Sequence, residues 1–141
     1  MVLVSINRGV RNFRASLTGP ISPGNVINWV DAYEKVGYIT LIKFKYVTDA
    51  TVADRYVYAN IRVGSNPVML INVQSEFPQP ASTTYTYFIA QGYQNKKIGN
   101  FVYLALPKIY AELPTAVEYN AVDRQMTDSL RDLEFMTTNI I

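Results

Sequence analysis

The stretch that decides the fold is Tyr56–Val63, which reads Tyr-Val-Tyr-Ala-Asn-Ile-Arg-Val. Its aliphatic residues fall at every second position, and the positions between them hold Tyr, Asn and Arg. An alternation of this length predicts a β-strand with one buried face, because successive side chains of a strand point to opposite sides of the sheet. We therefore expect the chain to be built from half-buried strands.

The segment Tyr38–Val47 repeats this pattern, with Lys43 and Lys45 pointing away from a face that carries the apolar residues Tyr38, Ile42, Phe44 and Tyr46. Six further segments have the composition of short strands: residues 10–17, 68–74, 83–90, 100–106, 117–122 and 130–136. About eight short strands separated by turn residues are typical of all-β proteins. We predict an antiparallel β-sandwich of the jelly-roll type.

Two segments also permit a helix. Residues 26–36 carry apolar residues close to a helical period, and Asn25 could cap that helix, so helix and strand are equally supported there. Residues 125–135 allow a helix as well, but Leu133 and Phe135 alternate with charged residues, which favours a strand for the second half. The prediction is therefore at most one short helix.

The chain is 141 residues long and contains no internal repeat and no linker, which indicates one domain. We divide it into a basic N-terminal arm or first strand over residues 1–20 and a sandwich domain over residues 21–141. No apolar run approaches the roughly 18 residues needed to span a bilayer, and the N-terminus has no secretory-signal pattern. A membrane partner is not expected.

The composition argues against an enzyme. The sequence has no cysteine and no histidine, which excludes disulfides, thiolate zinc sites, cysteine nucleophiles and every Ser-His-Asp triad. The remaining carboxylates, such as Asp49, Asp54, Glu112 and Glu118, lie in or near predicted turns without a spacing that pairs them. We expect no catalytic residue, metal, cofactor or small-molecule substrate, and we interpret Asp54 and Arg55 as an ion pair that anchors a loop.

The charges are unevenly distributed along the chain. The first thirty residues contain Arg8, Arg11 and Arg14 and no acid. The last twenty-two residues carry the acids Asp123, Asp128, Asp132 and Glu134 against Arg124 and Arg131. Both ends could simply be solvated, which is the commoner case. Alternatively, the arginines form an arm that docks on an acidic surface, because the guanidinium group pairs with two carboxylate oxygens at once.

Four tyrosines are candidates for contact with a partner: Tyr56, Tyr58, Tyr85 and Tyr87. Tyrosine is enriched in protein interfaces, and aromatic rings also serve as platforms for sugars. The competing interpretation is that these rings fill the sandwich. Nucleic-acid binding is not expected, because the aromatic and basic residues of Lys43-Phe44-Lys45-Tyr46 lie on opposite faces.

Three segments and a late acidic region carry a resemblance to a known class of proteins: residues 44–61, 81–87, 104–107 and the region with Asp123 and Asp128. The first joins a strand, a Thr-containing loop and an Arg that opens the next strand. Over residues 29–134 this pattern resembles small β-sandwich (jelly-roll-like) virion structural proteins of tailed bacteriophages. The turn at residues 64–67 departs from the Asp-Gly type of those proteins.

The resemblance implies a non-enzymatic virion component that is assembled in the host cytoplasm. We expect an auxiliary or decoration (cement) protein that binds the major capsid protein or neighbouring virion proteins and forms a homo-oligomer. Two alternatives remain open: a head–tail completion or tail protein, and a carbohydrate-binding β-sandwich module.

Overall fold

The computed structural model describes residues 12–30, 37–64, 68–109 and 114–138, which form ten strands and no helix. The strands are β1 (Asn12–Leu17), β2 (Val26–Val30), β3 (Tyr38–Val47), β4 (Tyr56–Val63), β5 (Met69–Gln74), β6 (Thr84–Ala90), β7 (Lys96–Ile98), β8 (Phe101–Ala105), β9 (Thr115–Val122) and β10 (Ser129–Thr138). Within the same ranges, no helix is long and apolar enough to cross a membrane. The all-β prediction is confirmed.

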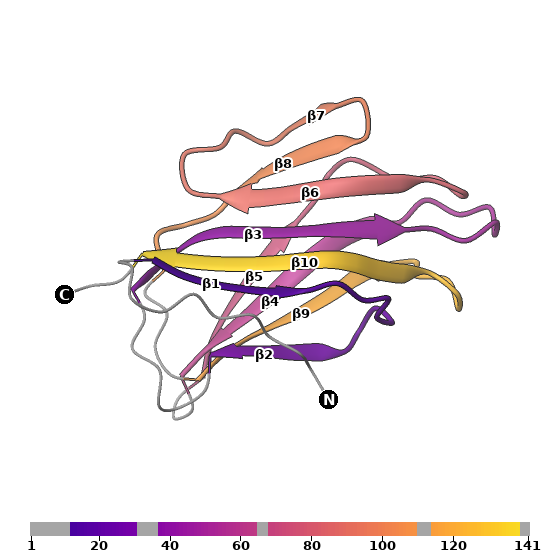
Figure 1. Ribbon diagram of the computed structural model, residues 1–141. Helices are drawn as coiled ribbons and strands as arrows, with labels where there is room; N and C mark the ends of the chain where they lie inside the picture. The colour runs from indigo at the N-terminus through magenta and orange to yellow at the C-terminus, as the bar shows by residue number, and fades with distance from the viewer. Residues whose placement is uncertain (1–11, 31–36, 65–67, 110–113, 139–141) are drawn as a thin grey trace.

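The strands form two sheets that pack face to face (Figure 1). Sheet A has the order β1-β10-β3-β6-β8-β7, and sheet B has the order β2-β9-β4-β5. Without β7 and β8, each sheet has four strands, and every connection except β4–β5 passes from one sheet to the other. This is the jelly-roll arrangement, so the predicted sandwich type is confirmed.

The strands β7 and β8 extend sheet A beyond this eight-stranded framework. The chain leaves β6, forms β7 at the outer edge, and returns as β8 between them, so β8 pairs with β6 in parallel. This is a departure from a purely antiparallel sandwich. The strand β7 was not among the predicted strands, because it has only three residues and two of them are lysines.

Most predicted strands have the expected bounds, and β3 and β4 match residue for residue. The helix considered for residues 26–36 is wrong for Val26–Val30, which is strand β2, and residues 31–36 lie outside the described residues. The predicted face of Tyr38 is also wrong. A register shift between β3 and β10 near Thr40 places Ile39 in the core instead, because an irregularity of this kind reverses the alternation of faces.

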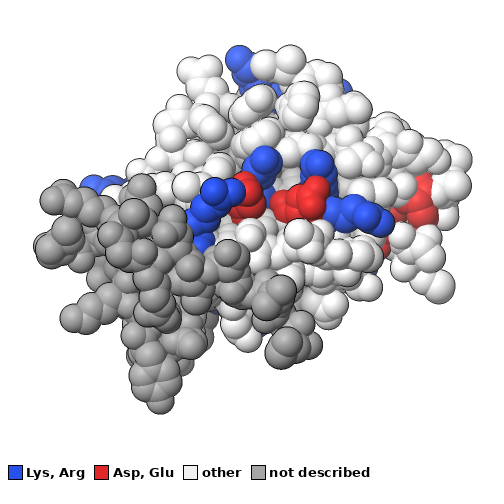
Figure 2. Space-filling model, viewed as in Figure 1, with Lys and Arg blue, Asp and Glu red and all other residues white. Residues whose placement is uncertain are grey.

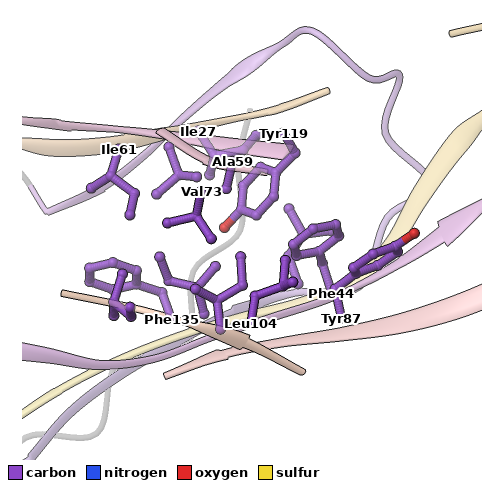
Figure 3. Close-up of a cluster of buried hydrophobic side chains, with 14 of the residues drawn as sticks. Ile27, Phe44, Ala59, Ile61, Val73, Tyr87, Leu104, Tyr119 and Phe135 are labelled. Carbon is purple, nitrogen blue, oxygen red and sulfur yellow. The ribbon is translucent and has the colours of Figure 1, made fainter. Parts of the chain in front are cut away.

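The core lies between the sheets and is rich in aromatic rings (Figure 3). The ring of Phe44 stacks on Tyr87 within sheet A and meets Tyr119 of sheet B edge to face, with centroids 4.9 Å apart in the second pair. Trp29 stacks on Phe135 across the sandwich, and its Nε1 donates a 2.8 Å hydrogen bond to Tyr119 Oη. The Phe44–Tyr119 and Trp29–Phe135 contacts join the two sheets and position the surfaces described next.

Candidate functional site

A buried ion cluster lies at the end of the sandwich where β3, β4 and β10 meet, and it consists of Tyr46, Asp49, Arg55 and Asp128. Arg55 directly precedes β4 and is fully buried because it points to the same inward side as Val57. Its five donor N–H groups all find acceptors: two carboxylates and two loop carbonyls. The bonds go to Asp128 Oδ2 (3.1 Å), Asp128 Oδ1 (3.1 Å), Asp49 Oδ1 (2.8 Å), Thr51 O (2.9 Å) and Ala53 O (2.7 Å).

Asp128 is the centre of this cluster. Burial acts to raise the pKa of Asp128, but hydrogen bonds from Arg55 and from the backbone N–H groups of Gln125 and Asp49 outweigh it and lower the pKa. Burial and the Asp128 carboxylate raise the pKa of Tyr46, whose hydroxyl donates a 2.9 Å bond to Asp128 Oδ2. Hydrogen bonds, first of all from the Thr127 hydroxyl, lower the pKa of Asp49 to about 2. Both carboxylates are therefore ionised at neutral pH.

The cluster corrects the loop-anchoring prediction. Arg55 does anchor a loop, but its partners are Asp49 and Asp128, and Asp54 is exposed. All the oxygens of the cluster are engaged with one cation and with N–H or O–H donors. In the described ranges no three acidic residues gather in a way that could hold a metal ion. The chemistry of the cluster is therefore structural: it ties the 48–55 loop to the start of β10.

The outer face of sheet A carries a row of alternating charges (Figure 2). Arg14 Nη2 on β1 lies 2.7 Å from Glu134 Oε1 on β10, and Lys43 Nζ on β3 lies 3.9 Å from Glu134 Oε2. A second pair joins Lys45 Nζ to Asp132 Oδ2 at 3.0 Å. These exposed pairs contribute little to stability, since such contacts are typically worth 0–1 kcal/mol. They leave this part of the face polar and close to neutral.

The row continues as aromatic rings toward the β7 edge. Glu134, Lys43, Phe88, Tyr103 and Lys96 are direct cross-strand partners on β10, β3, β6, β8 and β7. The Lys43 ammonium lies 5.5 Å from the centroid of the Phe88 ring, which stacks on Tyr103 at 5.1 Å. One face of the sheet therefore passes from paired charges to a group of rings.

The structure separates the four candidate tyrosines. Tyr56 and Tyr58 lie half-buried on the outer face of sheet B, so they remain available for contact with a partner. Tyr85 and Tyr87 are 5% and 0% exposed, so they are not available for contact with a partner and that prediction is wrong for these two residues. They share the inward face of β6 with Ile89, and Tyr87 Oη donates to the buried Gln79 Oε1 at 2.8 Å. Here the competing interpretation, that the rings fill the sandwich, is confirmed.

Of the three candidate arginines, Arg8 and Arg11 lie outside the described residues. Arg14 is on β1, and its guanidinium group pairs with Glu134 of the same chain while remaining more than half exposed. The basic and acidic ends predicted from the sequence therefore meet within one molecule at this point, because β1 and β10 are neighbours in sheet A.

Two features were not predicted from the sequence: the buried ion cluster around Arg55, and the group of rings on the outer face of sheet A. The position of Arg55 carried a usable signal: it falls on the aliphatic face of the Tyr56–Val63 alternation, and a buried arginine needs acidic partners. The ring group carried none, because Phe88 and Tyr103 come together only through the parallel pairing of β6 and β8.

Comparison of the chain with protein-family models, with curated proteins and with solved structures returns no match. The resemblance to virion proteins therefore stays a prediction. The chain is assigned to a fold, the jelly-roll β-sandwich, and not to a family.

Proposed function

We propose that this chain is a non-enzymatic virion structural protein that binds the outer surface of an assembled phage capsid as an auxiliary, decorating subunit. The observation that carries the proposal is the use of its charged groups. Asp49 and Asp128 form ion pairs with the buried Arg55. Asp132 and Glu134 form ion pairs with the basic side chains Lys45 and Arg14 on the surface. These four acids are thus committed to holding the sandwich or to pairing on its flat face, and they are not arranged to act together across a cleft as the acids of a carboxylate hydrolase do. A rigid sandwich with broad faces suits adhesion.

The jelly roll supports the same proposal, because double-sheet jelly rolls recur in viral capsid proteins, although they also occur in lectins and cupins. The fold alone therefore favours a class of roles and not one role. The partner in this proposal is the major capsid protein or a neighbouring virion protein.

Contacts between copies would use the edge of sheet B. Its last strand, β5, contains no charged residue, and Val68, Met69 and Leu70 are 45%, 47% and 67% exposed. An uncharged edge strand presents free backbone N–H and C=O groups to another strand. Antiparallel pairing of β5 with β5 of a second copy would oppose no like charges, so we expect a two-fold homodimer.

Sedimentation velocity of the purified chain tests the self-association. We expect a concentration-dependent dimer that Leu70→Lys abolishes, since a lysine on an edge opposes pairing. The control is Ile98→Lys on the β7 edge, which already carries two lysines and should leave the dimer intact. A monomer at all concentrations would reject the β5 contact.

Attachment to capsids is tested by pelleting the chain with shells assembled from the major capsid protein of the same genome. The variant Arg8→Ser/Arg11→Ser changes the proposed arm without altering the described strands. We expect it to lose attachment while Arg62→Ser/Arg131→Ser, which removes two exposed arginines elsewhere, retains it. Equal attachment of the two variants would reject the arm. Failure of the unaltered chain to pellet would reject the capsid-surface role.

A further inference from the structure

A hollow of about 410 Å³ opens at the β7 end of sheet A. It is lined by the β6–β7 loop, β7 and β8 through Gly92, Tyr93, Gln94, Lys96, Ile98 and Tyr103. Its size falls in the range of small-ligand sites, which is roughly 300–1,000 Å³. Figure 1 places β7 and β8 at one end of the sandwich, outside the two four-stranded sheets of the jelly roll. The framework is complete without them, so these residues are free to serve a ligand.

The rings of the hollow are fixed before any ligand arrives. Tyr103 stacks on Phe88 with an interplanar angle of 12°. Tyr93 stands at 85° to Tyr103 with ring centroids 5.5 Å apart, so the two tyrosines form two walls of a corner. The loop is held from behind by Asn95, whose Oδ1 accepts a 2.8 Å bond from the backbone N–H of Ala105. A preformed corner lowers the ordering cost of binding.

The hollow has a cationic character. Lys96 lines it, and the sequence contains no Asp or Glu between Glu76 and Glu112. In the cross-strand row, the acid on the same face is Glu134, which lies three strands from Tyr103 or roughly 14 Å at about 4.8 Å per strand. That carboxylate is paired with Arg14 and Lys43, and roughly 14 Å exceeds the screening length of about 8 Å at physiological salt. Charge complementarity therefore favours an anionic ligand.

We propose that this hollow binds an acidic pyranose, such as a uronic acid residue of a polysaccharide. A pyranose has a face of C–H groups that packs on aromatic rings and a rim of hydroxyls that needs polar partners. Here Tyr93 and Tyr103 receive the C–H face, the Lys96 ammonium pairs with the carboxylate, and the Gln94 amide bonds to hydroxyls. The proposal does not depend on the virion role.

Single-stranded nucleic acid fits the hollow less well, although it is also anionic. Binding of successive bases needs a series of aromatic faces that are open to stacking. In this structure Phe88 and Tyr103 stack on each other, and Lys43 lies over the Phe88 ring. The hollow thus offers one corner instead of a track of platforms.

Isothermal titration calorimetry tests the proposal. The acidic probes are oligogalacturonate, oligoalginate and a sialylated oligosaccharide; the neutral probe is cellohexaose, and the nucleic-acid probe is a ten-residue oligothymidylate. We expect at least one acidic probe to bind at least about tenfold more tightly than cellohexaose and the oligonucleotide, the ratio that one charge-assisted bond supplies.

Two variants locate the site. Lys96→Ala should weaken the acidic probe at least about tenfold and remove the preference over cellohexaose. Tyr93→Ala, at a side chain that is already 38% exposed, should weaken both sugars without affecting folding. Matched controls are Lys45→Ala and Tyr58→Ala, which lie outside the hollow. No binding to any acidic probe, equal binding of oligothymidylate, or equal effects of the site and control variants would overturn the proposal.

Discussion

Removal of the Asp128 carboxylate is expected to be among the most damaging single changes in this protein. The substitution Asp128→Ala deletes two acceptor oxygens that together receive five hydrogen bonds, three of them from Arg55 and Tyr46. The other two come from the backbone N–H groups of Asp49 and Gln125. The Arg55 side chain remains fully buried and keeps one carboxylate, Asp49, in place of two.

The burial of the Asp128–Arg55 ion pair determines how much free energy of unfolding should be lost. Breaking a buried ion pair by removing one partner costs about 3–5 kcal/mol, because the remaining charge stays desolvated. Breaking the surface pair Lys45–Asp132, whose side chains are 41% and 51% exposed, by Lys45→Ala should cost at most about 1 kcal/mol. Lys45→Ala is therefore the control, because Asp132 itself has a φ of 52°, where an alanine would add backbone strain. Asp128→Asn keeps the side-chain volume, so a loss of about 3 kcal/mol there would assign the effect to charge and not to a cavity.

Urea unfolding followed by the fluorescence of the single tryptophan measures these values. Trp29 is 3% exposed and stacks on Phe135, so unfolding changes its surroundings completely. With an m value of about 2 kcal/mol/M, a 4 kcal/mol loss lowers the midpoint by about 2 M. Similar midpoints for Asp128→Ala and Lys45→Ala would refute the reasoning, since a buried and an exposed ion pair would then contribute equally.

Three further outcomes follow from the same structure. Tyr119→Phe leaves the buried Trp29 Nε1 without its acceptor and should lower the free energy of unfolding by about 1–3 kcal/mol in urea. Tyr87→Ala should cost about 3–5 kcal/mol, as a core ring does; an unchanged thermal midpoint would contradict its burial. Acidification should destabilise the protein between about pH 4 and pH 2, because the pKa of Asp49 is lowered from an ordinary value of about 3.9 to about 2. The stability that is present above pH 4 is lost as the carboxylate of the folded protein takes up its proton. Asp49→Asn should make the free energy of unfolding depend less on pH in this acid range, as measured by urea unfolding at several pH values.

The strands could be predicted from the sequence because the pattern that specifies each strand lies within the strand itself. In Tyr56–Val63 and Tyr38–Val47 a period of two is enough to give the strand, its length and most of its buried face. The exception at Tyr38 depends on a register shift against β10, which is distant in the sequence. The strand β7 is three residues long and carries two lysines, so its pattern is too short to detect.

The candidate sites could be predicted less well because they depend on which strands become neighbours. The inward position of Arg55 could be read from the alternation, but its partner Asp128 could not, since a separation of 73 residues carries no periodic signal. The sequence left the tyrosines of β6 open between surface and core, because two rings at alternate positions fit either. Ile89, at the next inward position, was the residue that favoured the core.

The pairing of the first and last strands has a mechanical consequence. Asn12 lies opposite Thr138, and the two strands run antiparallel, so both ends of the sandwich leave from one corner. A force that pulls these ends apart would break the residue pairs between β1 and β10 one after another, starting with this pair, and would separate β1 from sheet A. A force applied between the two ends would therefore meet little resistance. The same force applied perpendicular to the two sheets would have to separate the whole aromatic core at once.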